Sequence, residues 1–153
     1  MEILTVAATH PGSLLESRQI PSDVSLVVPL VCRLVGRLVA EGRVTEEDRR
    51  KVELCLDEAV TNAVTHGNDS NFEKLVTVRL FESGPCWGVL ITDEGEGFDA
   101  DQVPDLEVEE QLWQESGRGI ALMRLYMDEV VYFDGGRSVR MIRACAPAPE
   151  GGR

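Results

Sequence analysis

The stretch that decides the fold of this chain is Glu58-Ala-Val-Thr-Asn62-Ala-Val-Thr-His66-Gly67. It belongs to an apolar pattern with three- and four-residue spacing, formed by Val52, Cys55, Leu56, Ala59, Val60, Ala63 and Val64. This spacing predicts a helix with one buried face. Glu58, Asn62 and His66 recur every four residues, so we expect them along one edge of that face. A carboxylate one turn from a carboxamide at the rim of a core is costly unless both have partners.

Two glycine-rich motifs further along the chain are candidates to supply those partners. Asp93-Glu-Gly95-Glu-Gly97 follows an expected strand, and Gly117-Arg118-Gly119 precedes an expected helix. Glycines let backbone N–H groups approach an anion closely, and a helix N-terminus can receive phosphate oxygens. Each motif alone is typical of a turn or a helix start. Their order behind an amide-bearing helix favours a nucleotide site.

The three stretches together resemble the N box, G1 box and G2 box of the GHKL ATPase superfamily. That superfamily contains histidine kinases, gyrase-type topoisomerases, heat-shock chaperones and mismatch-repair proteins. The resemblance is strongest to the anti-sigma-factor serine/threonine kinases, and it runs from about Arg18 to Arg143. It includes the wording Asp57-Glu-Ala-Val-Thr-Asn-Ala63 and the ending Met127-Asp-Glu-Val-Val131. The implied fold class is α+β, a two-layer α/β sandwich (the Bergerat ATP-binding fold) with three helices over a mixed, mainly antiparallel sheet.

Periodicity and turn signals predict the remaining elements. Besides the long helix they are a strand at 14–20, helices over 24–41 and 119–127, and hairpins at 75–82 with 87–92 and 130–133 with 138–144. The length of 153 residues predicts one histidine-kinase-like ATPase domain, residues 13–146, between flexible tails at 1–12 and 147–153. The apolar stripe from Leu26 to Val39 fits either core packing or part of a homodimer interface.

Composition limits the partners of this chain. A formal net charge of −12 argues against a nucleic-acid-binding surface and against adhesion to an anionic membrane. No apolar run is long enough to span a bilayer, and no secretion signal is visible, so we expect a cytoplasmic protein. The four cysteines lack the spacing of a zinc clip, and Cys32 and Cys55 are expected to be reduced and buried on apolar helix faces.

The resemblance implies ATP and Mg²⁺ as cofactors and assigns a role to each part of the site. Asn62 would bind the metal, and Glu58 would be the catalytic base, although a carboxylate that only tunes the cation's environment is the alternative. Asp93 would accept the exocyclic amine of adenine, while Gly95 and Gly97 pass close to base and sugar. The other nucleotide-binding candidates are His66 at the helix end, Ser116, Gly117, Arg118 and Gly119 near the phosphates, and Ser138 in place of a hydroxyl residue common in the superfamily. An Arg118 side chain pointing into solvent is equally compatible with the pattern.

The implied function is an ATP-dependent serine/threonine protein kinase that also acts as an anti-sigma factor. Its expected partners are a sigma factor, a STAS-domain anti-anti-sigma factor that it phosphorylates, and a second copy of itself. From Asp93 through Ser116 there are ten acidic residues and no lysine or arginine. This acidity favours an alternative, an ATP-gated protein-binding module with little phosphoryl transfer. A free-standing ATPase that uses water as the acceptor is a third possibility.

Overall fold

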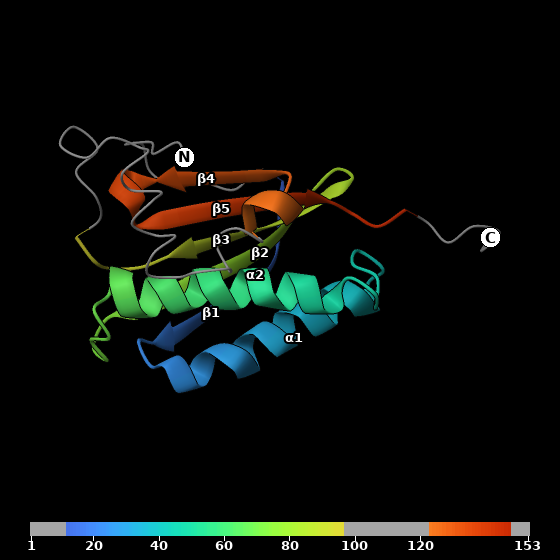
Figure 1. Cartoon of the computed structure of the whole chain (residues 1–153). Helices are drawn as coiled ribbons and strands as arrows, with labels where there is room; N and C mark the ends of the chain where they lie inside the picture. The colour runs from blue at the N-terminus through green and yellow to red at the C-terminus, as the bar shows by residue number, and fades with distance from the viewer. Residues whose placement is uncertain (1–11, 97–122, 148–153) are drawn as a thin grey trace.

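The computed structural model describes residues 12–96 and 123–147 of the chain. Figure 1 shows its helices and strands. The strands are β1 (Ser13–Pro21), β2 (Leu75–Ser83), β3 (Cys86–Thr92), β4 (Glu129–Phe133) and β5 (Ser138–Ala144). The helices are α1 (Val27–Ala40) and α2 (Arg49–Asn62), and the shorter turns are the 3₁₀ turn η1 (Val24–Leu26), the π-helical turn η2 (Ala63–Gly67) and the turn η3 (Asp134–Gly136). Residues 123–126 form a further helical segment. The expected strands and helices are therefore present wherever the chain is described.

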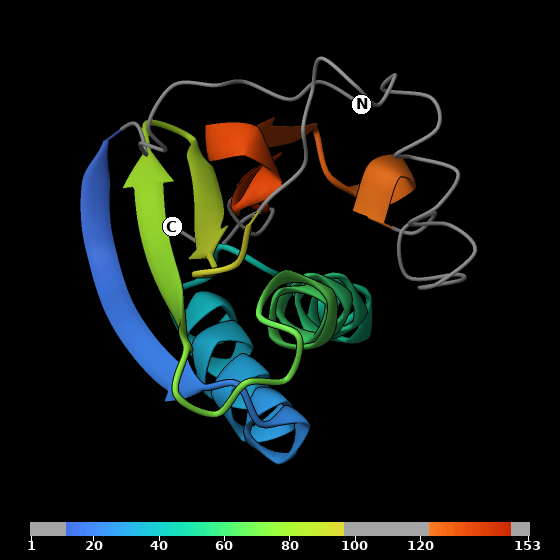
Figure 2. The same cartoon turned by 90° about the vertical axis from the view of Figure 1, so that its left-hand side faces the viewer.

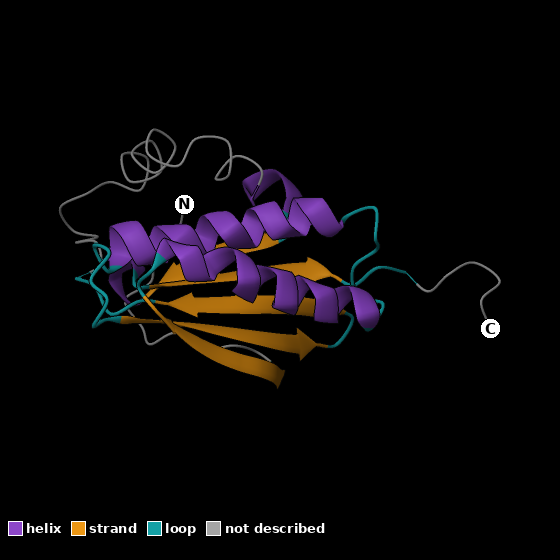
Figure 3. Ribbon diagram, turned by 90° about the horizontal axis from the view of Figure 1, so that it is seen from below, coloured by secondary structure: helices purple, strands orange, loops and turns teal. Residues whose placement is uncertain are grey.

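The strands form one sheet in the order β1-β2-β3-β5-β4. Each of the four pairings between described strands is antiparallel. The helices lie together on one face of this sheet (Figure 3), and the twisted sheet curves around α1 and α2 (Figure 2). This arrangement confirms the expected two-layer α/β sandwich. Because β3 is central, its end is surrounded by both the helical layer and the neighbouring strands.

The core lies between the two layers. Its composition decides whether the apolar stripe from Leu26 to Val39 is core packing or part of a homodimer interface. The α1 residues in the buried cluster are Val27, Leu30, Val31, Leu34, Val35 and Leu38, and those of α2 include Val52, Cys55, Leu56, Ala59 and Val60. The stripe is thus core packing, since burial of apolar area stabilises the sandwich. The structure corrects one expectation: Cys55 is buried, but Cys32 is exposed because it falls outside the buried stripe of α1.

Local signals between the two helices end α1 and begin α2. Gly42 follows α1 with a φ of +75°, in the left-handed region that suits a helix C-terminus. The Thr45 hydroxyl then accepts a hydrogen bond of 3.1 Å from the backbone N–H of Asp48, as expected for a capping residue. These two signals place α2 antiparallel to α1 and direct its C-terminus toward the end of β3.

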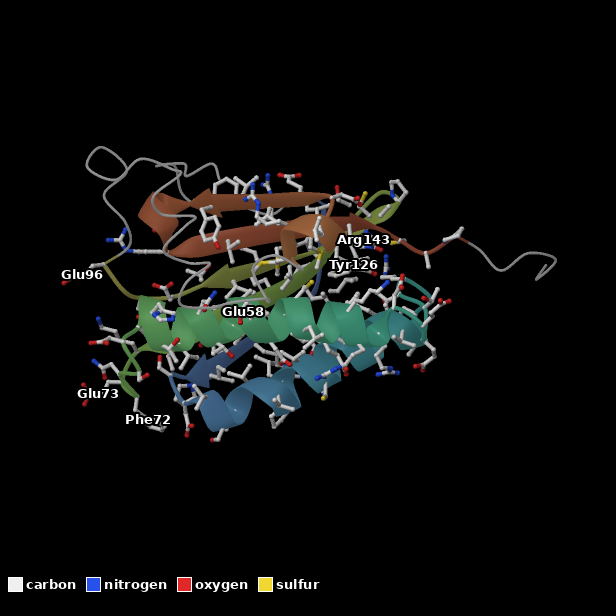
Figure 4. All side chains as sticks on the ribbon, in the orientation of Figure 1. Glu58, Phe72, Glu73, Glu96, Tyr126 and Arg143 are labelled. Atoms are coloured by element: carbon white, nitrogen blue, oxygen red, sulfur yellow. The ribbon has the colours of Figure 1, made fainter. Side chains whose placement is uncertain are left out.

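A cluster of ion pairs at Glu16 and a cation–π contact at Tyr126 connect the helical layer to the sheet. Arg33 of α1 and Arg18 of β1 both donate to the Glu16 carboxylate, which fastens the edge strand to the helix. Burial raises the pKa of Glu16, but these hydrogen bonds outweigh it and lower the pKa to about 2. Toward the β4 edge of the sheet, the Arg143 guanidinium of β5 lies 3.7 Å from the ring centroid of Tyr126, in the 123–126 segment (Figure 4).

Within the described ranges, no helix combines the length and the hydropathy needed to cross a membrane.

Candidate nucleotide-binding site

The helix that carries Glu58 and Asn62 changes from α-helical to π-helical winding after Asn62. Glu58 and Asn62 lie on α2, and both are partly buried. Directly after Asn62, residues Ala63–Gly67 form a π-helical turn, a local widening that is frequent at functional sites. His66 lies within this π-helical turn and is exposed. The α-helical spacing therefore holds from Glu58 to Asn62, and His66 follows where the winding has changed.

The residue after this turn, Asn68, connects three parts of the fold. Its side chain is fully buried, and its amide nitrogen donates to the Ser22 hydroxyl at 2.9 Å and to the Leu75 carbonyl at 3.0 Å. Its amide oxygen accepts a 2.7 Å hydrogen bond from the backbone N–H of Glu94. The end of the long helix is thereby joined to the start of β2 and to the turn after β3. Sequence reasoning missed Asn68, because only its burial distinguishes it from an ordinary loop asparagine.

The turn after β3 is pressed directly against the end of the helix. A Cβ atom on Gly67 would lie 2.2 Å from Oδ2 of Asp93, and one on Gly95 would lie 1.8 Å from the Gly67 carbonyl oxygen. Real Cβ atoms do not approach other atoms so closely, so both positions require glycine for space. The structure thus brings the first two motifs of the sequence together at one end of the sandwich. Figure 4 shows Glu96 at that same end, beyond Glu58 along α2.

Asp93 is a buried carboxylate, with 8% of its surface exposed. Its Oδ1 accepts a 2.8 Å hydrogen bond from the backbone N–H of Gly95, and in the described part of the chain this is the one hydrogen bond to the carboxylate. Burial raises the pKa of Asp93 to about 6, although that hydrogen bond and the positive charges of Arg137 and Lys74 oppose the rise. A buried group with acceptor capacity left is suited to receive a donor from a ligand.

Ser138 lies beside Asp93 at the start of β5. It is 1% exposed, pairs with Thr92 across the β3–β5 ladder, and its hydroxyl lies 2.9 Å from the Thr92 hydroxyl. The candidate hydroxyl of Ser138 is therefore buried in the sheet and held by the hydroxyl of Thr92, the residue before Asp93. Gly97, Ser116, Gly117, Arg118 and Gly119, together with most of the acidic stretch, lie outside the described residues.

The oxygen donors of α2 fit a magnesium ion shared with phosphates. Mg²⁺ is usually held by one or two protein side chains, while phosphates and waters fill its other positions. Asn62 and Glu58 offer an amide oxygen and a carboxylate one helical turn apart. Among residues 12–96 and 123–147, no group of three or more His, Cys, Asp or Glu side chains could hold a metal by itself. A metal at this position would therefore depend on a bound nucleotide.

We expect Asp93→Asn to make the free protein more stable above pH 6. The raised pKa means that ionised Asp93 costs folding free energy above about pH 6, and this cost disappears as the pH falls toward the ordinary value of 3.8. At pH 8 the variant should gain up to about 3 kcal/mol in free energy of unfolding. Urea denaturation at pH 4, 6 and 8 measures this gain, with exposed Asp69→Asn as the control. A difference between wild type and Asp93→Asn that does not vary with pH would contradict it.

The sandwich, with the helix end closed onto the turn after β3, defines a two-layer domain of the histidine-kinase-type ATPase fold. A family model for the histidine kinase-like ATPase domain matches residues 20–143, and the chain belongs to this family. This membership implies ATP as the ligand.

Curated relatives carry a more specific name. The anti-sigma F factor of Bacillus cereus (strain G9842) is 32% identical over 99 residues, which cover 63% of this chain and 67% of the relative. Anti-sigma F factors of Bacillus thuringiensis (strain Al Hakam) and Bacillus mycoides (strain KBAB4) match with the same identity and coverage.

Proposed function

We propose that this chain is an ATP-dependent serine/threonine protein kinase and anti-sigma factor of a bacterial partner-switching system. Its substrate would be a STAS-type anti-anti-sigma protein. Two findings support the proposal: membership of the histidine kinase-like ATPase family, and similarity to relatives named anti-sigma F factors.

The observation that carries the proposal is the buried Asp93 carboxylate against the end of the helix that bears Glu58 and Asn62. A buried carboxylate that accepts one backbone N–H in the described part of the chain suits the exocyclic amine of adenine, and it disfavours a base that presents a carbonyl there. With adenine at Asp93, the phosphates would extend toward the α2 residues. This orientation makes Asp93 the residue that selects ATP.

Asn62 and Glu58 of α2 would carry out the phosphoryl transfer. Asn62 would hold Mg²⁺, which neutralises phosphate charge when it is bound. Glu58 would accept the proton of the attacking serine or threonine hydroxyl. The hydroxyl oxygen bonds to the γ-phosphorus, the bond from that phosphorus to the bridging oxygen breaks, and ADP leaves. The acceptor protein gains a phosphoryl group of about −2 charge, which would weaken its contact with an acidic partner such as this chain.

A second candidate function is an ATP-gated protein-binding module with little phosphoryl transfer. The observation that favours it is the acidic composition from Asp93 through Ser116, which has no lysine or arginine to face the phosphates.

We also propose that the chain forms a homodimer. The Leu26–Val39 stripe does not support this, because most of its apolar residues lie in the core.

The test uses the purified full chain with ATP, Mg²⁺ and candidate STAS proteins encoded beside it. Calorimetry should detect ATP binding that Asn62→Ala weakens strongly, and label from γ-labelled ATP should appear on a serine or threonine of one STAS protein. Binding without transfer to any partner would favour the gated module. Phosphate release without a partner would favour the free ATPase. A wild type that does not bind millimolar ATP with Mg²⁺ would overturn all three.

A further inference from the structure

The turn between β4 and β5 brings an arginine next to the Asp93 turn. Asp134, Gly135 and Gly136 all have positive φ values, of 51°, 64° and 95°, which reverse the chain tightly. The next residue, Arg137, stands directly before the Thr92–Ser138 pair of the β3–β5 ladder. Its carbonyl oxygen accepts a 2.8 Å hydrogen bond from the backbone N–H of Asp93, so the ladder continues for one further step.

The side chain of Arg137 then reaches along the turn and binds its backbone carbonyls. Its Nε donates to the Gly95 oxygen at 2.7 Å, and its Nη2 donates to the Glu96 oxygen at 2.8 Å. Its Nη1 donates to the carbonyl oxygen of Asp134 at 3.1 Å, within its own turn. One guanidinium thus joins the β4–β5 turn to two successive carbonyls of the turn that follows Asp93. We refer to these three hydrogen bonds as the Arg137 clasp.

The opposite side of the turn is held by Asn68, which follows the end of the helix, and by the start of β2. Asn68 accepts from the Glu94 N–H, and the Glu94 carboxylate accepts from the Leu75 N–H. Between these contacts and the Arg137 clasp, Asp93 has little freedom to move, because Gly67 packs against its carboxylate without a gap. The turn is therefore fixed from two sides, and among the described residues Arg137 supplies the side-chain hydrogen bonds to the Gly95 and Glu96 carbonyls.

Arginine chemistry is required for this arrangement. A guanidinium presents five N–H donors in a planar fork, so it can serve several carbonyls in fixed directions, whereas a lysine ammonium is a compact charge on a flexible stem. Asp93, Glu94, Glu96 and Asp134 surround the turn with negative charge, so a cation is also favourable there. Lysine keeps that charge but cannot reproduce the three directed bonds.

We propose that Arg137 is a positioning residue that sets nucleotide affinity and base selectivity by holding the Asp93–Glu96 turn in place. The proposal rests on the proposed ATP site, since a carboxylate selects a base only when its own position is fixed. In this view the affinity for adenine nucleotides depends on a side chain whose hydrogen bonds, in the described part of the chain, go to backbone carbonyls. Selectivity would fall with affinity, because a loose carboxylate can adjust to the wrong base.

The test compares wild type, Arg137→Lys and Arg137→Met. Arg33→Lys is the matched control, because Arg33 donates to Glu16 on the edge of the sheet remote from Asp93. Without nucleotide, hydrogen exchange of the Glu94 and Gly95 amides should quicken by about tenfold in both Arg137 variants. With Mg²⁺, both should bind ATP about tenfold more weakly and show a smaller ratio of ATP to GTP affinity, while the urea midpoint of unfolding stays unchanged.

Three results would overturn the inference. Unchanged exchange at Glu94 and Gly95 would mean that the clasp does not hold the turn. An Arg137→Lys variant with wild-type affinity and ATP-to-GTP ratio would mean that charge alone matters. A fall in ATP affinity at an unchanged ATP-to-GTP ratio would limit Arg137 to a general structural role. A wild type that does not bind ATP contradicts the proposed function instead, and the exchange measurement still decides whether the clasp holds the turn.

Discussion

Glu58→Gln is expected to lower phosphoryl transfer by about 10²- to 10⁴-fold, the usual contribution of a general base. ATP affinity should change by less than about threefold, because glutamine has nearly the same size and keeps an amide oxygen toward a cation. Glu58 is only partly buried, beside the α2 face that packs into the core, so the substitution leaves the core contacts of α2 in place. Quantifying label transfer to the STAS partner beside calorimetric ATP titration separates the two effects.

The matched control is Glu53→Gln, on the same helix. The Glu53 carboxylate lies near Cys32 of α1, away from the proposed ATP site, so transfer should remain within about twofold of wild type. If Glu58→Gln transfers label at the wild-type rate, Glu58 only tunes the cation's environment. If it loses ATP binding as well, the carboxylate acts in nucleotide binding rather than as the base.

Gly95→Ala is expected to reduce ATP affinity by about 100-fold, the effect of a displacement of about 1 Å in a binding group. The new Cβ atom would lie 1.8 Å from the Gly67 carbonyl oxygen and 2.7 Å from its carbon, both of which are backbone atoms. Backbone cannot rotate away, so the turn must move from the end of the helix and take Asp93 with it. The overpacking should also cost about 1–3 kcal/mol of unfolding free energy.

Gly36→Ala provides the control for a glycine substitution in the same domain. A Cβ atom at Gly36, inside α1, has only the Arg49 guanidinium nearby, at 4.0 Å. Alanine there should stabilise the protein by about 0.5–1 kcal/mol and leave ATP affinity unchanged. Urea denaturation and ATP titration of both variants test the pair. Wild-type ATP affinity in Gly95→Ala would show that the close approach of Gly67 and Gly95 is not needed for binding.

Part of the candidate site was predictable because its signals are local. The spacing of Glu58 and Asn62 follows from α-helical geometry, and α2 preserves it. Asp93 was expected at the end of a buried strand, where the structure has it. His66 was expected on a continuous α-helix, but it lies in the π-helical turn that follows Asn62. Nothing in the periodicity of apolar residues reports that change.

The roles of Asn68 and Arg137 can be recognised only in the folded structure. Asn68 and Arg137 both hold the Asp93 turn, although they come from segments that lie 25 residues before it and 44 residues after it in the numbering. Asn68 directly follows the first motif and Arg137 directly precedes Ser138, but each looks like an ordinary loop residue in the sequence. Their roles arise when β5 pairs with β3 and the end of α2 packs against the start of β2.

The order of strands and helices, the buried stripes and the family could be read from the residues alone, because periodicity, turn residues and motif wording are properties of neighbouring positions. The tertiary structure alone decided how Gly67, Asp93 and Gly95 meet and which side chains secure the turn. Those contacts depend on packing between distant segments, where gaps of an ångström decide whether a methyl group fits. A linear pattern does not encode such distances.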